Sequence, residues 1–422
     1  MKLDVASMNH SICPLPATSA SPHEPEDEGP ATAVLPRGLV LLIATACGSC
    51  VANVYYAQPL LETLATEFGL THAAAGVVVT VTQVGSALAL LFLVPLGDLV
   101  ERRRLMLLQL MALGGALILA GAASSRPMLL FSMVMVGLLG TAMTQGLIAY
   151  AATAAPIAER GRVVGAVQGG VVMGLLLARV VSGLVADLAG WRFVYLGSAG
   201  LSLALLAVLW KVLPKQEVGA QPLSYPRLLG SMVTILAGDR VLQIRGTLAL
   251  LMFAGLNIFW SAMVLPLAAP PFGFSHTVMG AFGLVGAVGA LGASRAGYWT
   301  GRGRGQWVSG MALALLLLAW LPLAFSLHSL WALVTGILVL DLGGQALHVA
   351  NQSMIFQRGT EAHSRLVGCY MAFYAVGSGL GAVSATAMYA HAGWSGVCLL
   401  GSGVSLLALV FWWVSRRWMP TG

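Results

Sequence analysis

The feature that most constrains this chain is a succession of long apolar runs with very few charged residues. After Arg37 there are twelve, most of them about as long as the roughly 20 residues that an α-helix needs to cross a bilayer. They cover residues 38–61, 74–97, 105–123, 128–151, 163–187, 193–213, 246–268, 277–299, 307–326, 330–356, 366–389 and 395–415. A spanning segment must satisfy its own backbone polar groups, so each run is expected to be helical. We therefore predict an all-α membrane protein with twelve transmembrane helices.

Composition excludes the soluble alternatives. Charged residues make up 9% of the chain, against about 25% in soluble domains, too few to cover a water-facing surface. The net charge of +7 does not indicate a nucleic-acid partner, because the basic residues are scattered between apolar runs. The sequence contains no phosphate-binding loop and no metal-ligand cluster. We therefore expect no cofactor, no metal and no ATP drive.

Polar interruptions divide the chain into four segments. Residues 1–36 are rich in Pro, Ser and acidic residues and are predicted to be a disordered cytoplasmic tail. The longest interruption, 214–245, is predicted to be a cytoplasmic central loop between six spans in 37–213 and six in 246–417. This topology places nineteen of the 22 Lys and Arg residues on one side of the membrane and two on the other. The positive-inside rule then predicts a multi-pass protein of the inner membrane with both termini in the cytoplasm.

The two halves resemble each other at an offset of 202 to 204 residues. Residues 53–56 (NVYY) align with 257–260 (NIFW), and the AGW of 189–191 recurs at 392–394. Two further matches lie between them, 98–102 with 300–304 and 162–165 with 365–368. Six-span halves repeated in the same orientation are related by an axis along the membrane normal. The repeat predicts two pseudo-symmetric six-helix bundles around a cavity that can open to either side.

The stretch between the second and third runs resembles the hallmark motif of the major facilitator superfamily, Gly-x-x-x-Asp-Arg-x-Gly-Arg-Arg. Asp98, Arg102 and Arg103 match it, although the glycines are displaced or replaced. The resemblance extends from the first run to the last and implies the fold of that superfamily and a transporter, not an enzyme. It implies a gating motif at the cytoplasmic mouth, made of Asp98, Arg102, Arg103 and, in the second-half copy, Arg302 and Arg304. The alternative is that these arginines serve positive-inside topology alone.

The fifth run resembles the drug–proton antiporter branch, whose motif is Gly-x-x-x-Gly-Pro-x-x-Gly-Gly. Residues 174–183 keep small side chains there, and Arg179 replaces the proline. The resemblance implies proton-coupled efflux of a small organic solute or drug by alternating access. Two alternatives stay open: an uptake symporter or facilitator for a small metabolite, and an intramembrane enzyme using Asp341 and His348 as acid and base. We expect a small-molecule substrate, protons and lipid as partners, and a monomer.

Charged side chains inside the runs need a role, because each costs about 2.5–3.5 kcal/mol at the bilayer centre. Arg179 lies ~24 Å into the fifth run, where it could attract anionic substrate groups or be pinned to backbone carbonyls. Asp341 begins a series with Gln345, His348 and Gln352 on one helix face. Desolvation disfavours an ionised carboxylate unless a positive partner opposes it, so Asp341 is the first proton-coupling candidate. His348, whose type titrates near neutral pH, is the second, and a structural hydrogen-bond network is the alternative for both.

Uncharged polar residues concentrate in the runs that, in the superfamily, face the central cavity. The substrate-cavity candidates, besides Arg179, are Asn53, Tyr56, Gln58, Gln83, Gln145, Asn257, Trp260, Gln345 and Gln352. Amides and aromatics with few charges favour a neutral or amphipathic small solute. For any single one of them, helix packing explains the residue as well as ligand contact does.

Overall fold

The computed structural model describes five stretches of the chain. They are residues 36–156, 159–214, 224–292, 294–356 and 363–419, without the side chains of Asp98, 290–292, Ser294, Phe356 and 363–364. In these stretches the regular structure is helical and contains no strand. Ten of the described helical segments are long and apolar enough to cross a membrane. The chain is thus an all-helical membrane protein, and the predicted tail lies outside the described residues up to position 35.

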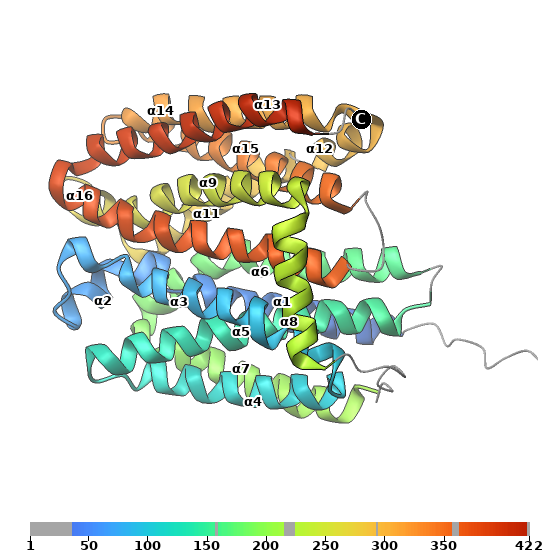
Figure 1. Cartoon of the computed structure of the whole chain (residues 1–422). Helices are drawn as coiled ribbons and strands as arrows, with labels where there is room; N and C mark the ends of the chain where they lie inside the picture. The colour runs from blue at the N-terminus through green and yellow to red at the C-terminus, as the bar shows by residue number, and fades with distance from the viewer. Residues whose placement is uncertain (1–35, 157–158, 215–223, 293, 357–362, 420–422) are drawn as a thin grey trace, which may run out of the picture. The chain divides into compact units, whose positions relative to one another are not determined.

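Residues 37–212 form a first helical set. It comprises α1 (Arg37–Tyr55), η1 (Gln58–Leu60), α2 (Leu61–Glu67), η2 (His72–Ala74), α3 (Val77–Leu88), η3 (Ala89–Leu93), η4 (Pro95–Asp98), α4 (Arg102–Gly121), α5 (Arg126–Ala154), α6 (Arg160–Ala189) and α7 (Trp191–Val212). Figure 1 shows the long helices of this set lying side by side with roughly parallel axes.

Residues 240–418 form a second helical set. It comprises α9 (Arg240–Ala262), α10 (Val264–Ala268), α11 (His276–Gly292), α12 (Ser294–Trp299), η5 (Thr300–Arg304), α13 (Gly305–Leu318), α14 (Trp320–Ala324), α15 (Leu330–Phe356), α16 (His363–Ser415) and η6 (Arg416–Trp418). The 53-residue α16 is interrupted at Gly393, whose φ is 61°. This break falls between the runs predicted at 366–389 and 395–415.

The two halves of the repeat turn in the same way. Gly190 and Gly393, which the AGW repeat aligns, both have positive φ, 93° and 61°. Only glycine adopts this conformation without strain, so each glycine permits a sharp reversal between two helices. The tryptophan that follows is buried in each half: Trp191 Nε1 donates to Glu67 at 2.5 Å, and Trp394 Nε1 donates to the carbonyl of Leu323 at 2.9 Å. The repeated tripeptide is therefore a repeated local structure.

The segment predicted as a central loop contains regular structure. Residues 225–238 form α8 (Tyr225–Gly238), and α9 already begins at Arg240, capped by Asp239, whose carboxylate accepts from the backbone amides of Val241 and Leu242. Figure 1 shows α8 lying across the other helices. Because α9 starts six residues earlier than the run at 246–268, Arg245 lies inside a helix and is fully buried. The sequence had assigned it to the loop.

Each helical set has its own hydrophobic core. The first core is built from residues 39–213, with Ala382 of α16 as the one exception, and the second from residues 241–419. Between apolar helices in lipid, small residues that allow close backbone approach replace the hydrophobic effect as the main packing device. In the first set, a Cβ on Gly48 would collide with the backbone of Gly170, and one on Gly174 with that of Gly48.

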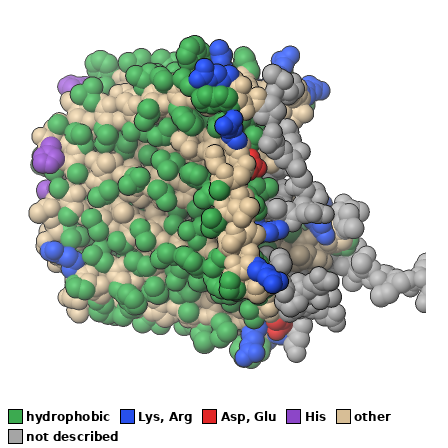
Figure 2. All heavy atoms as spheres, viewed as in Figure 1, with side chains coloured by type: hydrophobic (Ala, Val, Ile, Leu, Met, Phe, Trp, Pro, Cys, Tyr) green, Lys and Arg blue, Asp and Glu red, His purple; other side chains and the backbone are tan. Residues whose placement is uncertain are grey.

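The outer surface is apolar between two polar ends. Figure 2 shows hydrophobic side chains along the middle of the molecule and Lys and Arg mainly at the end that carries α8. Exposed large apolar side chains include Met111, Met173, Trp210, Met311 and Leu399. We call the end with α8 the α8 end, and the opposite end, which holds α2 and the turn before α11, the α2 end.

The two helical sets meet closely at the α2 end. Thr80 of α3 donates to the carbonyl of Gly379 in α16 at 2.8 Å, and the amide of Gly76 donates to Thr386 at 3.2 Å. On the other side, a Cβ on Gly183 of α6 would collide with the backbone of His276 in α11. These backbone-level contacts close the α2 end between the two sets.

Candidate substrate and proton site

Arg179 of α6 is buried, with 8% of its surface exposed. Its Nε donates to Gln58 Oε1 at 2.8 Å, and its guanidinium carbon lies 4.1 Å from the ring centroid of Trp260 and 5.7 Å from that of Tyr55. In the described part of the chain its guanidinium donates to a side chain and to no backbone carbonyl. The side chain is therefore held by an amide and two aromatic faces, which suit a guanidinium well.

Asp341 of α15 lies at the indole N–H edge of the same tryptophan. Trp260 Nε1 donates to its Oδ1 at 3.4 Å, and its Oδ2 faces Gly286 of α11, where a Cβ would collide with the oxygen. Asp341 and Arg179 interact electrostatically but form no ion pair within 4.0 Å. Each of the two side chains makes its own contact with Trp260. The two charges come from different helical sets.

An amide bridge joins the two sets beside these charges. Gln58 Nε2 donates to Asn257 Oδ1 at 3.2 Å, and Asn257 Nδ2 donates to the carbonyl of Phe253 one turn earlier in α9. Since the carbonyl of Gln58 accepts from Arg179, the amide is held at both ends and its orientation is defined. The structure thus brings together five predicted residues: Gln58, Arg179, Asn257, Trp260 and Asp341.

Two tyrosines outside the predicted set of site residues complete the wall of this cluster. The phenol groups of Tyr55 in α1 and Tyr374 in α16 hydrogen-bond to each other across the two sets. Phe253 packs edge-on against Tyr374 with centroids 4.3 Å apart. Gln83 is buried, and both polar atoms of its side chain lack a hydrogen-bond partner in the described part of the chain. Tyr55 lies inside the repeated NVYY motif, which was the available signal for it.

A second polar cluster lies around Arg245 of α9. Its Nη1 donates to Ser309 Oγ at 2.7 Å and to Asn351 Oδ1 at 3.3 Å, while Nε and Nη2 are buried without a partner. Tyr370 interacts electrostatically with Arg245, and its hydroxyl lies 2.9 Å from His348 Nδ1. His348 therefore belongs to the Arg245 cluster, and in the described residues it makes no hydrogen bond or ion pair with Asp341. An acid–base pair of the two, as an intramembrane enzyme would need, has no geometric support.

The other predicted cavity residues are dispersed. Asn53 Oδ1 accepts from Ser198 Oγ of α7 at 2.6 Å, and Tyr56 is buried in the first core. Gln345 and Gln352 are half-buried in α15. Gln145 lines a pocket at the α8 end together with Gln109, Arg102, Met232 and Arg365, so it lies apart from the Trp260 cluster.

The predicted gating arginines hold helix ends. Arg102 Nε donates to the carbonyl of Gly97 at 2.9 Å and its Nη1 to the carbonyl of Ala149 at 3.1 Å, while Arg103 Nη2 donates to that of Trp210 at 2.6 Å. The second-half pair behaves differently: the guanidinium groups of Arg302 and Arg304 stack on Tyr298 and Trp299, at 4.1 and 4.9 Å from the ring centroids. The side chain of Asp98 lies outside the described residues.

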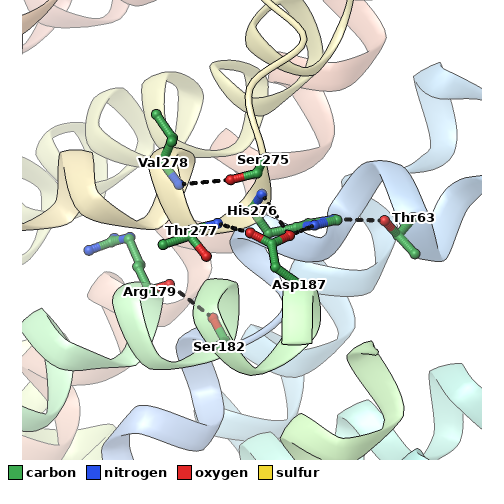
Figure 3. A network of polar contacts seen from close by, with 8 residues as sticks. All are labelled: Thr63, Arg179, Ser182, Asp187, Ser275, His276, Thr277 and Val278. Atoms are coloured by element: carbon green, nitrogen blue, oxygen red, sulfur yellow. Dashed lines mark hydrogen bonds and ion pairs between the residues drawn. The ribbon is translucent and has the colours of Figure 1, made fainter. Parts of the chain in front are cut away.

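A polar network closes the α2 end between α6 and α11. Asp187 of α6 accepts from His276 Nδ1 at 2.7 Å and from the backbone amides of His276 and Thr277, so it caps the first turn of α11. His276 Nε2 lies 2.8 Å from Thr63 Oγ1 of α2. Figure 3 shows His276 between Asp187 and Thr63, with the Arg179 side chain extending away from this network. We call Asp187, His276, Thr277 and Thr63 the α2-end latch.

Comparison with known proteins gives consistent results. The family model "Major Facilitator Superfamily" matches residues 41–357 and 245–420. The chain is 41% identical over 379 residues to the "Uncharacterized transporter YgaY" of Escherichia coli O157:H7, covering 90% of this chain and 96% of that protein. It is 30% identical over 418 residues to SCO4007 of Streptomyces coelicolor, also named as a transporter, covering 97% and 93%.

Solved structures show the same fold at low sequence identity. A bacterial homologue of the human lysosomal transporter Spinster, in an inward-facing and unoccupied conformation, superposes with a TM-score of 0.71 at 15% identity over 90% of this chain and 97% of that one. The nucleoside transporter NupG gives 0.71 at 14% identity over 90% and 98%, and the human organic anion transporter MFSD10 gives 0.66 at 17% over 89% and 100%.

Proposed function

This chain belongs to the Major Facilitator Superfamily and is a transporter of that type, and from this premise we propose that it exports a small organic solute in exchange for protons. The working unit is a monomer in the inner membrane with both termini in the cytoplasm. The α2 end then faces outward and the α8 end faces the cytoplasm, in agreement with the gathering of Lys and Arg at the α8 end.

The proposal includes twelve spans in two six-helix bundles. Ten described helical segments meet the length and hydropathy of a span; dividing α16 at Gly393 and adding the shorter apolar segment in α11 make twelve. The separate cores of the two sets and the equivalent reversals at Gly190 and Gly393 support the two-bundle division.

The observation that carries the function is the meeting of Arg179 and Asp341 at Trp260, because the two charges belong to different helical sets. When Asp341 is ionised, it attracts Arg179 across the set boundary. When it takes a proton, that attraction disappears, and the relative free energies of the two conformations change. A rocking motion of one set against the other would alter the distance between these side chains, which couples proton binding to access.

The two ends of the molecule support alternating access around this site. At the α2 end, close backbone contacts and the α2-end latch join the sets. At the α8 end, a pocket lies between residues of both sets, with Arg102 of α4 and Arg365 of α16 in its lining. In the proposed orientation, this arrangement fits a conformation that is closed to the outside. Arg102 and Arg103 are proposed to gate the cytoplasmic mouth by tying α4 to α5 and α7.

The test is the direction of flux under an imposed pH gradient. Purified protein is first screened for ligands by thermal shift, and the best ligand is loaded into proteoliposomes carrying the full chain. Exchange with protons predicts that acidifying the side opposite the ligand accelerates its exit, and that reversing the gradient reverses the effect. Faster movement of the ligand in the same direction as the protons would instead establish uptake by symport. A ligand flux that does not change with the pH gradient would establish a facilitator.

A further inference from the structure

The charged groups at Trp260 retain hydrogen-bonding capacity that the protein does not use. The Nε of Arg179 donates a hydrogen bond to Gln58. In the described part of the chain, no protein group accepts a hydrogen bond from its two terminal nitrogens. These nitrogens are also not among the atoms sealed from solvent. A guanidinium whose two terminal nitrogens are free presents a fork that matches a planar carboxylate.

Asp341 is in the complementary position. Its Oδ1 has one weak donor, Trp260 Nε1 at 3.4 Å, and its Oδ2 has no protein donor in the described residues and is not sealed. A carboxylate offers about four lone-pair sites, so most of its capacity is unused. Such a group at membrane depth can bind an ammonium.

The two opposite charges of the site further restrict the class of ligand that can bind there. A neutral ligand would leave the two charges with only their attraction over more than 4.0 Å, and an ion of either sign would make direct contact with one of them alone. A ligand with one carboxylate and one ammonium satisfies both. The rings of Trp260 and Tyr55 next to Arg179, and those of Phe253 and Tyr374 packed on each other, make the surroundings aromatic, which suits a molecule with an apolar body.

We propose that the transported solute is a small zwitterion of the amino-acid type, whose carboxylate binds Arg179 and whose ammonium binds Asp341 across the face of Trp260. This inference rests on the proposed function and specifies its substrate class. It also supplies a reason for exchange, because the ammonium and the transported proton compete for the same carboxylate. The solute binds when Asp341 is ionised and leaves when Asp341 is protonated.

The experiment uses matched ligands in which one charged group of the zwitterion is neutralised at a time. L-phenylalanine, L-phenylalaninamide and N-acetyl-L-phenylalanine, with the same three derivatives of L-leucine, are titrated against the purified full chain by calorimetry. In at least one series we expect the zwitterion to bind at least about tenfold more tightly than its amide and its N-acetyl derivative, since each lacks one charge-assisted contact. Equal or tighter binding of either derivative overturns the inference.

Variants of Arg179 and Asp341 test which residue binds the carboxylate of the ligand and which binds its ammonium. Arg179→Gln should remove the preference for the zwitterion over the amide, and Asp341→Asn the preference over the N-acetyl form. Arg179→Lys, which keeps the charge, should retain part of the preference if Arg179→Gln does not fold. Arg192→Gln removes an arginine that pairs with Glu67 outside the site and should leave the binding pattern unchanged. Unaltered selectivity in both site variants contradicts the proposal.

Failure of the inference and failure of the proposed function are distinguishable. If none of the six compounds binds, the zwitterion class is overturned, while proton-driven flux of another ligand from the thermal-shift screen would still support exchange with protons. If the zwitterion binds but its flux does not respond to a pH gradient, the proposed substrate class is supported and proton coupling is refuted.

Discussion

Two arginines are buried among the described membrane-spanning helices, and they have opposite surroundings. Arg179 faces Trp260 and Asp341, with its terminal nitrogens neither bonded to the protein nor sealed. Arg245 is fully buried, bonded to Ser309 and Asn351, and has two nitrogens sealed without a partner. A charge that a ligand must reach has to stay open, whereas one enclosed by neutral groups can only organise the helices around it. From this difference we propose that Arg179 acts in transport and that Arg245 supports the structure.

The largest expected effect is the loss of transport when Arg179 is replaced. Arg179→Gln removes a charged contact with the ligand, worth up to about 3 kcal/mol, and should lower transport by ~100-fold. Thermal unfolding in detergent should change little, because among the described residues the neutral Gln58 amide is the one group that accepts a hydrogen bond from Arg179. Arg245→Met, the matched variant in the second set, should keep transport. Equal loss of transport in the two variants would remove the distinction between them.

The next effect is on stability at Arg245. Truncation to Ala leaves Ser309 and Asn351 without their donor and opens a cavity, so we expect a loss of about 2–3 kcal/mol in the free energy of unfolding. Arg245→Met refills the space with an apolar chain and removes a poorly solvated charge, so its loss should be much smaller. Unfolding monitored by tryptophan fluorescence measures both. A larger loss for Met than for Ala would show that the charge itself holds the fold.

A smaller effect is expected at Gly286, which faces Asp341. A Cβ there would collide with Asp341 Oδ2, so Gly286→Ala must displace the carboxylate from Trp260. We expect transport to fall by about tenfold, in keeping with the sensitivity of positioned groups to displacements near 1 Å. Gly200→Ala on α7, where a Cβ meets nothing within 4 Å, is the control. Unchanged transport in Gly286→Ala would show that the position of Asp341 is not critical.

The smallest effect concerns the α2-end latch. Asp187→Ala removes the acceptor for His276 and for the first turn of α11, and should shift the population towards opening at this end by a few-fold. Spin labels at the exposed His72 and His391, one in each helical set, report the change as a longer distance in pulsed electron spectroscopy. A distribution identical to that of the unmutated chain would assign the latch no part in access.

The sequence predicted much of the fold, because long apolar runs leave helices as the only spanning structure available to a single chain of this kind. It also selected five of the residues that meet at Trp260, since a polar side chain inside an apolar run is costly and therefore conspicuous. It did not find Tyr55 and Tyr374, because a tyrosine is compatible with an apolar run and hydropathy does not reveal how a helix is rotated. Arg245 was misassigned to a loop because the polar first turn of α9, capped by Asp239, resembles a linker in composition.

The central claim, that Asp341 carries the transported proton, is tested most directly by flux in proteoliposomes. The full chain and its Asp341→Asn variant are compared under pH gradients of both signs, with the ligand that gives the largest thermal shift. His348→Gln, a change in the Arg245 cluster, is the control. We predict that the unmutated chain and His348→Gln respond to the gradient and that Asp341→Asn does not. A response of undiminished size in Asp341→Asn would contradict the account.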